Sequence, residues 1–161
     1  MTLTTAEADT LLADHFAPWV LDLGLSTVET GERHAVLRWS DRLAREGGGL
    51  SGQALMAAAD TACVVAVSAA RGGFGPMTTV QQSTSFQRAV VGRDVLVHAR
   101  ITRLGRRIAF LDITLTTEPT EHTEHTGAAE ATGAAGAAAG TGSARGAEEP
   151  AAHATAVYAL G

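Results

Sequence analysis

The apolar positions of this chain follow two different periods. From Ala54 to Ala70 the sequence ALMAAADTACVVAVSAA is almost wholly apolar, with no polar stripe at the helical period, which predicts a helix covered on every side. In residues 107–117 apolar and polar positions alternate instead, and one face consists of Ala109, Leu111, Ile113 and Leu115. Such alternation is typical of a half-buried strand in an antiparallel sheet. The pattern therefore predicts an α+β fold in which one long helix lies on the apolar face of a sheet.

Turn and capping signals set the remaining boundaries. Thr4 and Glu7 form a predicted capping box for a short helix that reaches about His15. A Gly-rich segment, residues 46–49, precedes the long helix, and Gly and Pro residues break the chain after it. Strands are predicted at about residues 24–29, 32–39, 78–87, 94–103, 107–117 and 152–160.

Residues 118–150 interrupt this order. They contain six Glu and one Arg, are rich in Ala and Gly, and include no Leu, Ile, Val or Phe. Such a segment buries too little apolar surface to order itself. We therefore predict a single domain over residues 1–161, with a low-complexity disordered insertion at about 118–150 before the last strand. His122 and His125 lie among Glu residues there and could form a weak metal site, but solvated disorder is the favoured interpretation.

Composition narrows the function classes. The insertion accounts for the whole formal net charge of −5, and the rest of the chain is neutral and contains no Lys. A neutral domain without a basic and aromatic pattern argues against a nucleic-acid partner. We expect no uninterrupted apolar run of membrane-spanning length, and the N-terminus lacks the pattern of a signal peptide. The lone Cys63 is interpreted as a packing residue. These features predict a cytoplasmic protein with no membrane partner.

Residues 51–62, Ser-Gly-Gln-Ala-Leu-Met-Ala-Ala-Ala-Asp-Thr-Ala, follow the Gly-rich loop and precede a strand of the type MTTVQQSTSFQRAV. This combination resembles the phenylacetate-pathway (PaaI-like) family of acyl-CoA thioesterases, over roughly residues 15–117 and the last strand. The resemblance implies the hotdog fold, a curled antiparallel β-sheet wrapped around one long central helix. It also implies assembly into homodimers or homotetramers.

The family's helix opens with His-Gly-Gly and carries Asp-Thr-Ala eight residues after the first Gly. Gly52 and Asp60 match this pattern, whereas Ser51 and Gln53 replace the His and the second Gly, and Arg45 stands at the position of a family Asn. The resemblance therefore places the catalytic site at Gly52 and Asp60.

The chemistry can also be argued from the residues. Asp60 is the only acid on the apolar helix, and a carboxylate in apolar surroundings is costly unless it is hydrogen-bonded or paired. The amides of Gly52 and Gln53 at the helix start could stabilise the negative charge that develops on a thioester carbonyl oxygen. Asp60 could then act as a base toward water or as a direct nucleophile, and the sequence leaves both open.

Spacing adds a prediction about assembly. Eight residues of helix span about 12 Å, so one helix cannot bring Gly52 and Asp60 to the same carbonyl carbon. If two helices pair antiparallel across a dimer axis, Gly52 of one subunit can approach Asp60 of the other, giving two equivalent composite sites.

Further residues are candidates for substrate binding. Those that could line the pocket are Ser51, Gln53, Thr61, Gln82 and Thr84. The hairpin at residues 103–107 contains Arg103, Gly105 and Arg106, and in the resembling family the matching turn lies near the phosphates of coenzyme A, for which Arg is chemically suited.

Three other functions are alternatives to thioester hydrolysis. Residues 49–53 approach the Gly-x-Ser-x-Gly nucleophile elbow, but Gln53 occupies the last position and the chain lacks alternating strands and helices. Hotdog dehydratases use a His on or beside the helix, and none occurs between His34 and His98. A non-catalytic acyl-ligand binder or scaffold stays the open alternative. The prediction is a thioesterase acting on acyl-CoA, or on an acyl carrier, without metal or redox cofactor.

Overall fold

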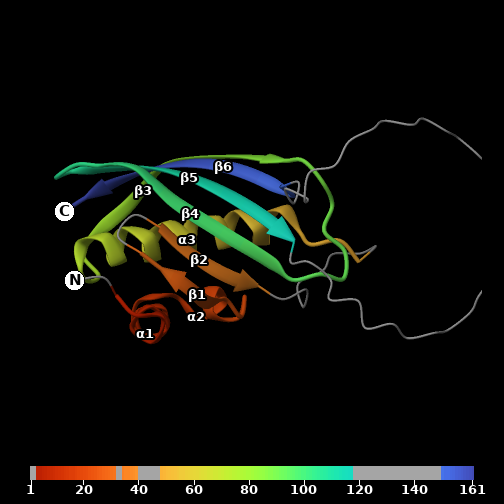
Figure 1. Ribbon diagram of the computed structural model, residues 1–161, viewed down its shortest axis with the longest axis horizontal. Helices are drawn as coiled ribbons and strands as arrows, with labels where there is room; N and C mark the ends of the chain where they lie inside the picture. Colours follow the sequence, from red (N-terminus) through yellow and green to blue (C-terminus); the bar gives the residue numbers. More distant parts are fainter. Residues whose placement is uncertain (1–2, 32–33, 40–47, 118–149) are drawn as a thin grey trace, which may run out of the picture.

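The computed structural model describes residues 3–31, 34–39, 48–117 and 150–161. Its elements, in chain order, are α1 (Thr5–His15), α2 (Pro18–Leu21), β1 (Ser26–Thr30), β2 (His34–Trp39), α3 (Gly52–Arg71), β3 (Met77–Phe86), β4 (Val95–Leu104), β5 (Ile108–Thr117) and β6 (Ala152–Leu160). The strands form one antiparallel sheet in the order β1-β2-β4-β5-β6-β3, which curls around α3 (Figure 1). The predicted α+β architecture, with one central helix, is therefore the observed one.

The local signals placed most elements to within two residues. The capping box of α1 is present: the Thr4 hydroxyl accepts from the Glu7 amide at 3.3 Å, and the Glu7 carboxylate accepts from the Thr4 amide at 2.8 Å. The short helix α2 was not predicted. It begins with Pro18 at its first position and has only four residues, too few to show a helical period.

The core lies between α3 and the inner face of the sheet. Alternate residues of the central strands are buried there, namely Val95, Val97, Ala99 and Ile101 on β4, Ala109, Leu111, Ile113 and Leu115 on β5, and Ala152, Ala154, Ala156 and Tyr158 on β6. This confirms the alternation predicted for residues 107–117. Many of the residues that meet in this core, on α3 as on β6, are alanines, and small side chains allow a helix to lie close to a sheet.

The surface of α3 corrects two expectations. Among the described helices, α3 is the one long and apolar enough to cross a membrane by length and composition, although no such run was expected. In the fold, 72% of its apolar window is buried, so core packing accounts for that composition. The helix is not covered on every side, however. Gln53 and Met56 are exposed, and Ala57 and Asp60 are half-buried.

These four positions recur every three or four residues and form one strip along the first half of α3, which we call the α3 strip. Its residues stay partly uncovered because the buried core residues of α3 lie on the other faces of the helix. Met56, 41% exposed, is an apolar side chain that the described part of the subunit leaves partly open to solvent.

The strand β3 is the edge of the sheet next to β6. It is ten residues long, and two of its large apolar side chains are open to solvent, with Val80 62% and Phe86 50% exposed. A long edge strand with exposed apolar side chains is a template for pairing with another strand. The predicted insertion lies, apart from Pro150, outside the described residues.

Candidate active site

Asp60 is held by two hydroxyl groups from the sheet. The Thr79 hydroxyl on β3 donates to Asp60 Oδ1 at 2.9 Å, and the Tyr158 hydroxyl on β6 lies within hydrogen-bond distance of both Asp60 Oδ1 and the Asp60 backbone carbonyl. Half-buried rather than buried, Asp60 meets the requirement that an acid near a core be hydrogen-bonded. Asp60 and these two hydroxyls therefore form a hydrogen-bonded polar site on an otherwise apolar helix.

The sheet register brings these two donors together. Thr79 and Tyr158 are direct partners in the antiparallel ladder between β3 and β6, and side chains of opposed residues lie on the same face. The register shifts between Thr79 and Gln81, which leaves Val80 as a bulge. Bulges re-aim neighbouring side chains and are frequent beside active sites.

The two hydroxyls distinguish the two oxygens of the carboxylate. Tyr158 is 1% exposed, and burial, with smaller contributions from Cys63 and Asp60, raises the pKa of its phenol, so it remains a protonated donor. Both donors point at Oδ1. Among the described residues, neither donor reaches Oδ2, which is therefore the oxygen available for chemistry.

The start of α3 provides free amides. Ser51 is the N-cap: its hydroxyl accepts from the Ala54 amide at 3.2 Å, and its carbonyl accepts from the Leu55 amide at 3.1 Å. The amides of Gly52 and Gln53 come before this ladder and have no acceptor among the described residues. The structure thus gives Ser51 a capping role and leaves the predicted donors, Gly52 and Gln53, unpaired.

The strand β3 runs beside the α3 strip from Asp60 back to Gly52. Gln82 donates to the Met56 carbonyl at 3.0 Å and to the Thr84 hydroxyl at 3.4 Å. Further along, the ring of Phe86 lies so close to Gly52 that a Cβ added there would meet it at 3.2 Å. Gln82 and Thr84 therefore lie between the two halves of the candidate site, as hydrogen-bonding residues that tie β3 to α3.

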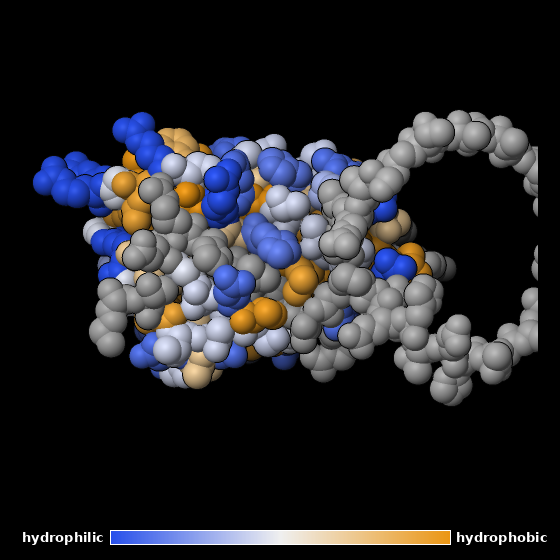
Figure 2. Space-filling model, viewed as in Figure 1, coloured by the Kyte–Doolittle hydropathy of each residue, from blue (hydrophilic) through white to orange (hydrophobic). Residues whose placement is uncertain are grey.

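The hairpin arginines lie at the other end of the molecule. The Arg107 carbonyl accepts from the Leu160 amide, and the Gly161 carbonyl accepts from Arg71, the last residue of α3. Figure 2 shows hydrophilic side chains projecting from the end where Figure 1 places the β4–β5 hairpin. Arg103, Gly105 and Arg106 are exposed there, and within one subunit they are not brought to Gly52.

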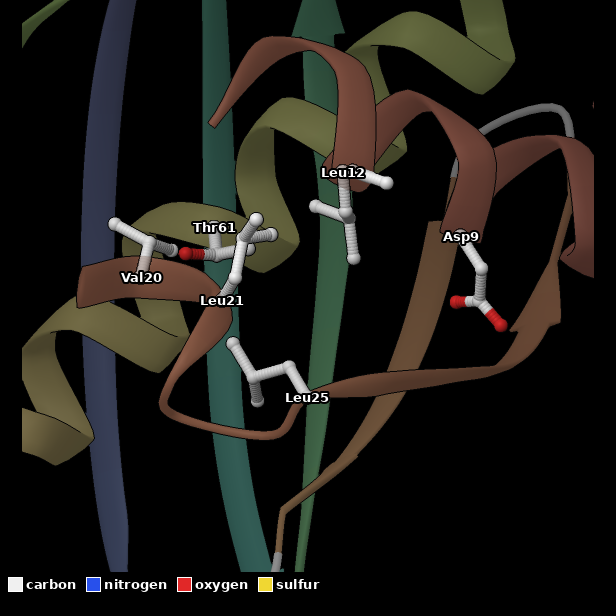
Figure 3. Close-up of a pocket in the computed structure, with 7 residues that line it drawn as sticks. Asp9, Leu12, Val20, Leu21, Leu25 and Thr61 are labelled. Atoms are coloured by element: carbon white, nitrogen blue, oxygen red, sulfur yellow. The ribbon is translucent and has the colours of Figure 1, made fainter. Parts of the chain in front are cut away.

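Thr61 lies on a different side of α3 from the α3 strip. Buried, it donates from its hydroxyl to the Ala57 carbonyl at 2.8 Å. It lines a cavity of about 100 Å³ between α1, α2 and α3, which Figure 3 shows.

No group of three or more His, Cys, Asp or Glu that could hold a metal occurs in the part of the chain that the structure describes.

Sequence reasoning missed Thr79 and Tyr158. Both come from strands far from Asp60 in the chain, and only the pairing of β3 with β6 reveals their shared position. A weak signal was present: Tyr158 is the only Tyr, and it stands at an inward position of a strand otherwise rich in Ala. Buried Tyr hydroxyls usually have a hydrogen-bond partner.

Comparison with known proteins bears on this geometry. Residues 47–123 match the family model of the Thioesterase superfamily. This segment is therefore similar to the domains of that superfamily. It contains α3, with Gly52 and Asp60, and the strands β3, β4 and β5. No curated protein matches the sequence.

Solved structures of thioesterases share the fold. A thioesterase from Haemophilus influenzae is 18% identical with a TM-score of 0.73, and the match covers 99% of this chain and 92% of that chain. Zebra fish thioesterase superfamily member 2 is 17% identical with a TM-score of 0.70, covering 100% and 99%. A candidate thioesterase from Silicibacter sp. is 25% identical with a TM-score of 0.73, covering 99% and 92%. The predicted hotdog fold is confirmed, and the PaaI-like subfamily stays a prediction.

Proposed function

We propose that this protein hydrolyses an acyl-CoA, or an acyl-carrier thioester, to a free acid and a thiol, as PaaI-like enzymes do. The observation that carries the proposal is the pair of features on α3: a half-buried carboxylate oriented by two hydroxyls, and a helix start with two unpaired amides. Thioester hydrolysis needs these two elements, a group that activates or replaces water and donors for the developing oxyanion.

In the reaction, Asp60 Oδ2 takes a proton from water while the water oxygen forms a bond to the thioester carbon. The negative charge that develops on the carbonyl oxygen is stabilised by the amides of Gly52 and Gln53. The tetrahedral adduct then expels the thiolate as the C–S bond breaks, and the proton passes from Asp60 to the leaving sulfur. In the nucleophilic variant, Oδ2 itself attacks the carbon, the C–S bond breaks as the thiolate leaves, and water hydrolyses the resulting anhydride to the free acid and the Asp60 carboxylate.

The proposal requires a dimer. The α3 strip and the β3 edge are adjacent, uncovered and partly apolar, and a two-fold axis beside them would pair β3 with the β3 of a second copy. The same axis would set the two α3 helices antiparallel, so that Gly52 of one subunit faces Asp60 of the other. It would also cover Met56 and Val80. We propose this homodimer, alone or within a homotetramer, for a cytoplasmic enzyme.

A panel of acyl-CoA thioesters tests the activity. Acetyl-, butanoyl-, hexanoyl-, dodecanoyl- and phenylacetyl-CoA are each mixed with the protein, and free thiol is followed with a chromogenic disulfide. The protein's own thiol should not interfere, because Cys63 is buried and burial, followed by the charge of Asp60, raises the pKa of its thiol. Turnover of at least one substrate is expected, and binding of the panel without turnover would favour the non-catalytic binder.

The role of Tyr158 can be separated from that of the fold. Tyr158→Phe removes a donor that orients the Asp60 carboxylate, so the rate of the chemical step should fall while the fold is kept. A hydrogen bond to a charged group corresponds to roughly a tenfold to hundredfold loss of kcat. Separate determination of kcat and KM provides the measurement, and KM should stay near the parental value.

A matched pair at Thr79 serves as the control for this positioning role. Thr79→Val removes the hydroxyl at nearly constant volume, whereas Thr79→Ser keeps it. The Val variant should lower kcat as Tyr158→Phe does, with KM near the parental value, and the Ser variant should behave as the parent. If Thr79→Val and Tyr158→Phe both keep the parental kcat, neither residue positions the carboxylate.

A further inference from the structure

The cavity beside Thr61 is built almost entirely from branched apolar side chains. Figure 3 shows Leu12 from α1, Val20 and Leu21 from α2, and Leu25 from the segment that follows, all around a space that α3 closes with Thr61. The polar groups in its wall are already paired: the Thr61 hydroxyl donates to a helix carbonyl, and Asp9 accepts from the Thr27 amide at 2.8 Å. Such a lining, with its one carboxylate at the solvent-exposed side, suits an uncharged apolar group.

One lining residue of the cavity, Thr61, is the direct chain neighbour of Asp60. Thr61 follows Asp60 on α3, and consecutive helical residues are about 1.5 Å apart along the axis and about 100° apart around it. Ala57, one turn earlier on the α3 strip, provides the carbonyl that Thr61 binds and has a small side chain. An acyl chain that passed over Ala57 to reach the space beside Thr61 would leave its carbonyl carbon on the Asp60 side of the helix.

The volume of the cavity limits the length of the acyl chain that it can hold. Its volume is about 100 Å³. A cavity of about 150 Å³ accommodates benzene, and a molecule of the size of water takes about 30 Å³ in a liquid, so this space holds about three or four carbon groups. A short aliphatic chain fills it, whereas an aromatic ring is too large.

The charge of Asp9 limits which acyl groups the cavity can hold. The carboxylate of Asp9 lies at the end of the cavity nearest β1 and is turned away from the labelled apolar side chains (Figure 3). A second carboxylate placed in the cavity would be desolvated and repelled by it, so acyl groups that end in a carboxylate should be excluded.

We infer that this cavity is the acyl subsite and that it selects short, uncharged aliphatic acyl groups of about four carbons. This inference rests on the proposed thioester hydrolysis for its biological meaning, but the cavity can be tested without any turnover. S-alkyl thioethers of coenzyme A cannot be hydrolysed, and their dissociation constants report on the subsite alone.

The first measurement uses calorimetry of the parent protein with S-methyl-, S-butyl-, S-octyl- and S-(3-carboxypropyl)-CoA. Each buried methylene should tighten binding about fourfold, so the butyl compound, with three more methylenes, should bind about 60-fold more tightly than the methyl compound. The octyl compound should gain little more, and the carboxypropyl compound should bind no better than the methyl one. Equal affinity for methyl and butyl, or no binding of any thioether, would overturn the inference.

Variants of the lining provide the second measurement. Ala13 is exposed on α1 and lines the cavity, so Ala13→Phe should fill it and lower the affinity for S-butyl-CoA to that for S-methyl-CoA. Ala6→Phe, on α1 but outside the lining, is the matched control and should bind as the parent does. Leu25→Ala should enlarge the space and extend the preferred chain by about two or three carbons.

The outcomes separate the two proposals. If Ala13→Phe and Leu25→Ala are folded and leave the chain-length profile unchanged, the cavity is not the acyl subsite, even where acyl-CoA turnover is found. If the profile changes as expected while the acyl-CoA panel shows no turnover, the subsite stands and the proposed hydrolysis is wrong.

Discussion

Asp60→Asn should reduce thioester hydrolysis by roughly three orders of magnitude, the scale expected when a group that takes up a proton in the transition state is lost. An amide oxygen can still accept from Thr79 and Tyr158, so the hydrogen bonds at Oδ1 survive. The group at Oδ2 becomes an NH₂, which can neither take a proton from water nor attack a carbonyl. The loss should appear in kcat with the melting temperature held or raised, since one charge near the core is removed.

Asp14→Asn is the matched control, because Asp14 is an exposed acid on α1 outside the candidate site. It should hydrolyse the same substrates at the parental rate. Asp60→Ala is a less clean test than the Asn variant. It would remove the acceptor of two hydroxyls, and the buried Tyr158 would keep only the backbone carbonyl at 3.0 Å. Turnover by Asp60→Asn at the parental rate would exclude Asp60 from the chemistry.

The sequence predicted the elements because their causes are local. The capping box at Thr4, the alternation along β5 and the apolar run of α3 each lie within a few neighbouring residues, and the structure agrees with all three. Burial of α3 on every side was wrong. Composition reports that a helix is apolar, but which face remains uncovered depends on where β3 and α2 pack, and such packing is a long-range property.

In the candidate site too, local features could be found from the sequence and long-range ones could not. Gly52, Gln53 and Asp60 could be found from one stretch of sequence, since the helix start and the lone acid are both local features. The partners that orient Asp60 could not, because the opposition of Thr79 and Tyr158 depends on the register of β3 against β6. Likewise, the arginines of the β4–β5 hairpin satisfy a chemical expectation, yet the fold places them at the end of α3 opposite to Gly52.

Because Gly52 and Asp60 are about 12 Å apart along α3, cross-subunit complementation is the sharpest test of the proposed dimer. Gly52→Pro removes one of the two free amides. Proline is tolerated at the first position of a helix, and the preceding Ser51 already has the extended conformation that proline requires. Loss of one oxyanion donor should lower kcat by about 10²-fold to 10³-fold. Gly52→Ala keeps the amide and is the control, with only the movable ring of Phe86 to displace.

Gly52→Pro and Asp60→Asn should each be nearly inactive alone, yet regain activity when they are unfolded together and refolded as mixed dimers. Random pairing makes about half of the dimers mixed, and each of these has one site with both functional groups and one with neither, so about a quarter of parental activity should return. Separate affinity tags on the two variants identify the mixed species. If purified mixed dimers are folded and no more active than the single variants, Gly52 and Asp60 do not meet across the interface.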